Sequence, residues 1–170
     1  MKKSKLFILL ICILVCAFGF NTYATSTSST YASGKAVIPS FTQQANIDTN
    51  LNVSNITNAP INVTITLYNY DGTVITDDND ANAGKIRGTN LLNYDDQNTN
   101  TTASFTLNGH STGVVNIYFY TSLNYGYGVI QWSQDSDNIN GLVVQGSYLN
   151  RETTGETSRY GIPINNGMPF

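Results

Sequence analysis

The stretch from residue 51 to residue 72 constrains the fold most strongly, because apolar and polar residues alternate along it. Aliphatic residues occupy every second position from Ile61 to Leu67, and polar or aromatic residues lie between them. Side chains of a β-strand point alternately to its two faces, so this spacing predicts a strand with one apolar face. The other face, which ends in Tyr68 and Tyr70, is either a solvated surface or a place where a ligand binds.

The same alternation recurs along most of the chain. Further strand-like segments lie at 45–53, 105–107, 115–120, 127–132, 142–148 and 160–164. Asp71-Gly72 and Asn108-Gly109 lie between apolar runs and predict hairpin turns, since glycine accepts a positive φ. We therefore expect an all-β fold, a single antiparallel β-sandwich of about seven or eight strands. The polar stretch 77–102 is expected to be a long connection or an irregular crossover between the sheets.

The N-terminus predicts export from the cell. Three lysines among the first five residues precede a mostly apolar run from 6 to 20, and Ala24 ends a Thr-Tyr-Ala motif. This pattern is typical of a secretory signal peptide, here residues 1–24. The apolar run is shorter than the ~20 residues of a membrane span, although a retained anchor is the alternative. A flexible polar leader over residues 25–34 and a β-sandwich domain over residues 35–170 are expected to follow.

Cysteine and charge limit the possible partners. Both cysteines, Cys12 and Cys16, lie inside the predicted signal peptide, so no disulfide or thiolate metal site is expected in the domain. All eleven acidic residues follow Ala24, against five of the eight basic ones. We therefore expect no nucleic-acid partner and, after signal cleavage, no membrane partner. The Asn-, Thr-, Ser- and Tyr-rich surface suits neutral polar ligands, although an AT-rich genome explains it equally well.

An aromatic stretch from residue 116 to residue 132 is the first candidate site. If Ile117 faces the core, the tyrosines beside it face outward, and their rings can stack on sugar C–H faces while their hydroxyls bond sugar hydroxyls. The predicted ligand-binding residues of this stretch are Tyr118, Tyr120, Tyr125, Tyr127 and Trp132. Tyr68 and Tyr70 extend this platform if their strand is a neighbour. The alternative is that these aromatics only form cross-strand pairs.

An acidic segment is the second candidate site. Asp78, Asp80 and Asn82 follow an Asp-x-Asp-x-Asn spacing, which lets alternate oxygens converge on a hard cation. The segment departs from an EF-hand loop, because Thr89 stands at the twelfth position where a glutamate is usual. We expect either a weak calcium site, the only cofactor that the sequence suggests, or a solvated acidic loop.

The segment 151–160 is the third candidate site. It contains both glutamates, Glu152 and Glu156, but nothing in their spacing indicates the paired carboxylates of a glycosidase. Arg151 or Arg159 is predicted to bind a sugar or a carboxylate, with Arg151 preferred, and a structural turn with local ion pairs is the alternative. His110 lies in a turn with no partner suggested for a catalytic triad, so it is expected at the surface. We therefore expect no enzymatic activity.

Part of the chain resembles a known family. Val129-Ile130-Gln131 and Val143-Val144-Gln145 are two strand-like segments that flank a short turn, and Arg151 follows them. This pattern, together with "NVTITLYNYDG" at 62–72, resembles the sensory rhodopsin transducer family. The resemblance implies a small β-sandwich that assembles as an oligomer, in a superfamily linked to carbohydrate or small-molecule binding. The signal peptide and the longer Asn-rich loops depart from that family, so a cytoplasmic signalling role is not expected.

These observations favour two functions. The first is a secreted, non-catalytic binding module for a polysaccharide or another neutral polar ligand. The second is a structural or adhesive component of a cell or spore surface, which forms homo-oligomers through strand edges and has no small-molecule ligand.

Overall fold

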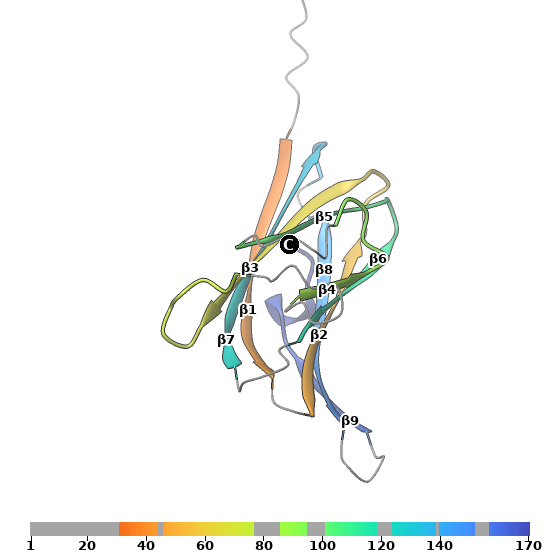
Figure 1. Ribbon diagram of the computed structural model, residues 1–170. Helices are drawn as coiled ribbons and strands as arrows, with labels where there is room; N and C mark the ends of the chain where they lie inside the picture. Colours follow the sequence, from red (N-terminus) through yellow and green to blue (C-terminus); the bar gives the residue numbers. More distant parts are fainter. Residues whose placement is uncertain are drawn as a thin grey trace, which may run out of the picture.

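The chain folds as a β-sandwich (Figure 1). The computed structural model describes residues 31–43, 46–76, 86–94, 101–118, 124–138, 140–151 and 157–170. Nine strands and one short 3-10 turn lie within these ranges. The predicted all-β sandwich is therefore confirmed, with slightly more strands than expected. The predicted signal peptide lies outside the described residues.

The strands form two antiparallel sheets. The order in the four-stranded sheet is β1 (Tyr31–Gln43), β7 (Asn124–Asp135), β3 (Ile61–Asn69) and β5 (Ala103–Leu107). The order in the five-stranded sheet is β4 (Ile86–Thr89), β6 (Thr112–Ile117), β2 (Ile47–Asn55), β8 (Leu142–Arg151) and β9 (Thr157–Ile162), and η1 (Asn165–Gly167) follows β9. From β1 to β8 the chain changes sheet at every described strand, so only β8 and β9 pair as sequence neighbours.

The apolar faces of the two sheets meet in one core. Along β3, Ile61, Val63, Ile65 and Leu67 are each at most 1% exposed, as the alternation predicts. Leu51 of β2 and Val115 of β6 meet this face from the other sheet and are fully buried. Burial of such a side chain contributes about 1.5–3 kcal/mol, so this seam is a main source of stability.

A buried polar cluster, which we call the polar knot, consists of the side chains of Asn55, Thr57 and Gln134. Asn55 is 2% exposed. Its Nδ2 donates over 2.8 to 3.2 Å to three backbone carbonyls, those of Ala59, Leu107 and Asn108. Its Oδ1 accepts from the backbone N–H and the hydroxyl of Thr57 at 2.9 and 2.8 Å. Gln134 donates to the Thr57 hydroxyl at 2.7 Å. The polar knot thus joins the turn after β2 to the end of β5 and to β7.

The two predicted hairpin turns differ in outcome. The Asp71-Gly72 turn is confirmed: Gly72 has a φ of +85°, and the chain folds back so that Val74 bridges Tyr68. The prediction of a hairpin at Asn108-Gly109 was wrong, because β5 and β6 belong to different sheets. The positive φ there, +54°, falls on His110, which is exposed as expected.

Two boundaries differ from the sequence analysis. Strand β1 begins at Tyr31, inside the expected leader and before the expected domain start at Lys35, because Ala32 and Ala36 pack into the core. The polar stretch 77–102 contains β4, a short strand that its composition did not suggest. No described segment is a helix of the length and apolarity needed to cross a membrane.

Candidate functional site

Four tyrosines gather at one end of the outer face of the four-stranded sheet. The register of β3 and β7 sets Tyr68 opposite Tyr127, and their rings stack with centroids 4.9 Å apart and planes inclined by 10°. Just beyond β3, Tyr70 stacks on Tyr125 with the same centroid separation and an angle of 20°. We call these four residues the tyrosine ladder. The expectation that Tyr68 and Tyr70 lie beside the aromatic strand is confirmed.

A glycine between the two β7 tyrosines makes this close pairing possible. Gly126 separates Tyr125 from Tyr127, and a Cβ atom at Gly126 would collide with the backbone carbonyl oxygen of Tyr68. Period-two geometry directs both flanking tyrosines to the outer face. The sequence Tyr-Gly-Tyr therefore provides two outward rings and a backbone that approaches β3 closely.

The stacking decides which parts of the rings face solvent. Parallel rings with centroids 4.9 Å apart must be offset and stacked, since rings lying in one plane would overlap at that separation. Each ring therefore covers part of one face of its partner. Tyr70 is 71% exposed, Tyr125 47% and Tyr127 40%. The tyrosine ladder thus leaves fewer ring faces open than the flat stacking platform that the sequence suggested.

The prediction that Trp132 faces outward with these tyrosines was wrong. Trp132 is 3% exposed and belongs to the core. Position 132 has the opposite parity to 125 and 127, so an uninterrupted strand must place it on the other face. Gly34 and Gly141 make room for the indole, because a Cβ atom at either would lie against it. Within the described part of the chain, the indole N–H has no hydrogen-bond partner.

The remaining predicted ligand residues do not join the tyrosine ladder. Tyr118 follows β6 in the other sheet, and its ring centroid lies 5.5 Å from the guanidinium carbon of Arg87, a cation–π contact. Tyr118 therefore does not share a surface with the β7 tyrosines, although they were predicted to form one ligand site. Tyr120 lies outside the described residues. Arg151 ends β8, with its backbone paired to Thr157, and its side chain is not among those described.

The predicted calcium ligands Asp78, Asp80 and Asn82 also lie outside the described residues, so the calcium site stays a prediction. Within the described ranges, no group of three or more His, Cys, Asp or Glu residues is placed to hold a metal ion.

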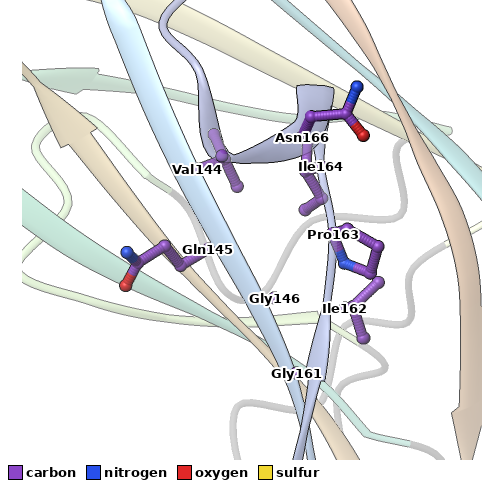
Figure 2. Close-up of a pocket in the computed structure, with 9 residues that line it drawn as sticks. Val144, Gln145, Gly146, Gly161, Ile162, Pro163, Ile164 and Asn166 are labelled. Carbon is purple, nitrogen blue, oxygen red and sulfur yellow. The ribbon is translucent and has the colours of Figure 1, made fainter.

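A shallow hollow of about 500 Å³ lies beside β8, where the strand has no pairing partner on this side for a few residues (Figure 2). The β8–β9 ladder ends at the pair of Gly146 and Ile162, and the chain then departs through Pro163 and η1. It returns to β8 at Phe170, whose backbone exchanges hydrogen bonds of 3.1 and 3.2 Å with Leu142. The hollow is lined by Val, Ile, Gly, Pro, Gln and Asn, none of which titrates, so its lining offers no general acid or base.

Three of the four edge strands among those described carry features that hinder further strand pairing. On β1, Lys35 is exposed, Pro39 lies within the strand, and the register with β7 shifts beside it. On β5, Thr106 exchanges backbone hydrogen bonds of 2.8 and 3.0 Å with Leu92. Strand β4 has only four residues. Lysine, proline, register shifts, covering segments and short length all protect a sheet edge.

Strand β9 is the edge with the fewest such features: it carries the exposed Arg159, but within the described residues it has no proline, no register shift and no covering segment. Of its six residues only Ile162 is buried, and among the described strands it pairs with β8 alone. Together with the end of β8 it extends at the lower end of the ribbon in Figure 1. Tyr160, near the middle of the strand, is 60% exposed. The outer side of β9 is therefore open to solvent along most of its length.

The hydrogen-bonding pattern between β8 and β9 shows which amides of β9 point outward. Leu142 turns its N–H and C=O toward Phe170, away from β2, so every second residue of β8 after it turns the same way. The hydrogen-bonded partners on β9 are then Ser158, Tyr160 and Ile162. The N–H groups of Arg159 and Gly161 consequently point away from β8, where another strand can accept them.

Comparisons with known proteins identify no family. No family model and no curated protein matches the sequence. Several solved structures are weakly similar, among them the three that follow. A Thermotoga maritima protein has a TM-score of 0.43 and 10% identity, over 75% of this chain and 88% of that one. BcpA, the major pilin subunit of Bacillus cereus, has a TM-score of 0.35 and 8% identity, over 78% of this chain and 38% of BcpA.

The third structure is of Bacillus endospore appendages described as disulfide-linked pili. Its TM-score is 0.22 with 18% identity, over 62% of this chain and 88% of that one. These similarities are too low to inform the function of the chain. The resemblance to the sensory rhodopsin transducer family stays a prediction.

Proposed function

We propose that this chain is a secreted, non-catalytic structural or adhesive protein of a bacterial cell or spore surface, and that it associates with further copies through β9. The observation that carries the proposal is the open outer side of β9, with the amides of Arg159 and Gly161 directed to solvent. An exposed strand edge is a template for pairing with another strand, and the other described edges are protected. The extracellular location rests on the signal peptide predicted at residues 1–24.

The chemistry of the described surface supports an association role over catalysis. The hollow beside β8 has no titratable lining, and no metal-binding group is found among the described side chains. Strand addition needs only backbone donors and acceptors at an accessible edge. A homo-oligomer is the simplest assembly, because every copy carries the same open edge.

Proline substitution on β9 tests this proposal. Arg159→Pro removes an N–H that points away from β8. The hydrogen bonds between β8 and β9 are therefore kept, while the outer edge of β9 loses a donor. Arg159→Ala is the matched control, since it removes the same charge and keeps the amide. Sedimentation velocity over a range of concentrations measures association, and circular dichroism with thermal unfolding measures folding.

We expect the wild type and Arg159→Ala to associate as concentration rises, and Arg159→Pro to remain monomeric with an unchanged fold. The proposal fails if the wild type stays monomeric throughout, or if a folded Arg159→Pro variant associates as the control does.

Carbohydrate binding at the tyrosine ladder is a second candidate. It is supported by the exposure of Tyr70 and Tyr125, whose hydroxyls and ring edges are accessible to sugar hydroxyls. A polysaccharide panel, assayed with calcium and with chelator, tests it. Binding that disappears in Tyr125→Ala and persists in Tyr31→Ala supports this candidate, and a chelator effect supports the calcium site predicted at Asp78. The absence of binding under both conditions excludes it for that panel.

A further inference from the structure

Tyr70 and Tyr125 of the tyrosine ladder are both exposed and in contact with each other. Tyr70 and Tyr125 are the more exposed rings of the two stacks, at 71% and 47%. They nevertheless lie in contact, with centroids 4.9 Å apart and planes 20° from parallel. Both phenols are therefore accessible to an oxidant at the surface, and the two rings already lie in contact.

We propose that Tyr70 and Tyr125 form an oxidative cross-linking site, at which hydrogen peroxide and a haem peroxidase couple the two rings into dityrosine. Each phenol gives one electron and one proton to the peroxidase, which leaves two phenoxyl radicals. A bond then forms between one ring carbon ortho to each hydroxyl. The hydrogens on those two carbons move to the two oxygens, which restores both aromatic rings and both hydroxyls.

The reaction balances with peroxide as the only co-reactant. The two tyrosines lose two hydrogen atoms in total, and one molecule of hydrogen peroxide takes them up to form two molecules of water. The peroxidase returns to its resting state.

The fold favours coupling within one chain over coupling between chains. Groups held in reacting geometry reach effective concentrations on the order of 10⁵ M, far above any protein concentration in solution. The approach of β7 to β3 at Gly126 maintains this geometry, because the glycine lets the strands pair directly beside the rings. Diffusional coupling between exposed tyrosines of two different chains lacks this advantage.

The cross-link would act as a covalent staple in a domain without cysteine. Residues 31–170 contain no cysteine, so no disulfide constrains the described strands. A bond between Tyr70 and Tyr125 ties the end of β3 to the start of β7 and closes a long loop of the chain. As with a disulfide, this restricts the unfolded chain and raises the temperature of unfolding.

Peroxidase treatment of the purified chain tests the proposal. Dityrosine fluorescence reports the product, denaturing gel electrophoresis separates cross-links within one chain from those between chains, and tandem mass spectrometry identifies the joined residues. The test variant is Tyr125→Phe, which keeps the ring and removes the phenol. The matched control is Tyr31→Phe, because Tyr31 is 69% exposed and lies opposite Asp135, at the other end of β7.

We expect a monomeric product that joins residues 70 and 125, in the wild type and in Tyr31→Phe alike, with a raised unfolding temperature. We expect Tyr125→Phe to lose most of this intrachain product. The proposal is overturned if the product is mainly intermolecular, if it joins other tyrosines, if no dityrosine forms, or if Tyr125→Phe gives the wild-type yield. These results do not depend on whether the chain associates through β9.

Discussion

Replacement of Asn55 by alanine should destabilise the domain strongly, although Asn55 is polar and lies next to a turn. The side chain is 2% exposed and bridges the turn after β2 to the end of β5. Alanine removes every one of these bonds and leaves a small void. The backbone N–H of Thr57 loses the acceptor that Asn55 provides at 2.9 Å.

The magnitude follows from which groups lose all their partners. A buried donor left without a partner costs about 1–3 kcal/mol, whereas a hydrogen bond whose groups find water or another partner costs about 1 kcal/mol. The carbonyl of Ala59 keeps the Thr57 hydroxyl and Gln134 as donors, and Asn108 is exposed enough to meet water. We therefore expect a loss of about 2–4 kcal/mol from the free energy of unfolding, a large share of the roughly 5–15 kcal/mol of a typical domain.

Urea unfolding followed by tryptophan fluorescence measures this loss. Trp132 is the only tryptophan in the chain and is buried in the core, so its emission reports the native packing directly. Asn52→Ala is the matched control, because Asn52 lies on the same strand with its side chain exposed. Its free energy of unfolding should change by no more than about 0.5 kcal/mol. Equal midpoints for the two variants would refute the role given to the polar knot.

Four further substitutions test the packing and the Asp71-Gly72 turn. Gly126→Ala should cost about 1–3 kcal/mol in chemical denaturation, because its Cβ meets the carbonyl of Tyr68, whereas Gly161→Ala, with open space around it, should be nearly neutral. Trp132→Ala should cost about 3–5 kcal/mol, measured by circular dichroism, and a small loss would contradict its place in the core. The pKa of the Asp71 carboxyl is lowered because the hydroxyl and the amide of Thr73 donate to it. This hydrogen bonding favours the native turn above the ordinary carboxyl pKa, and the benefit is lost as pH falls through the lowered value. Thr73→Val should raise the pKa of Asp71 toward its ordinary value in an NMR titration, and an unchanged pKa would contradict the assigned cause.

Local alternation predicted the class of fold and most of the strands, but it did not predict β1 or β4. Ile61 to Leu67 are buried as their spacing indicates, because strand parity is a property of neighbouring residues. The same rule, applied to Trp132, would have placed it in the core opposite Tyr125 and Tyr127. Its outward assignment followed from chemical suitability for sugar binding, and parity is the stronger constraint.

The long-range arrangement could not be predicted in this way. The polar knot joins Asn55 to Gln134 through Thr57 and contacts the end of β5, so it links strands of both sheets that no local pattern brings together. The turn at Asn108-Gly109 has hairpin composition but connects different sheets, because strand order decides its role. The tyrosine ladder depends on the register of β3 against β7, which a shift of one residue would destroy.

Hydrogen–deuterium exchange of β9 tests the proposed assembly most directly. The amides of Arg159 and Gly161 point away from β8, so they should exchange quickly in dilute protein. If copies add through this edge, raising the protein concentration should slow exchange in the segment 157–162 and leave β1 unchanged. Exchange in 157–162 that is independent of concentration, while the protein associates, would contradict the account.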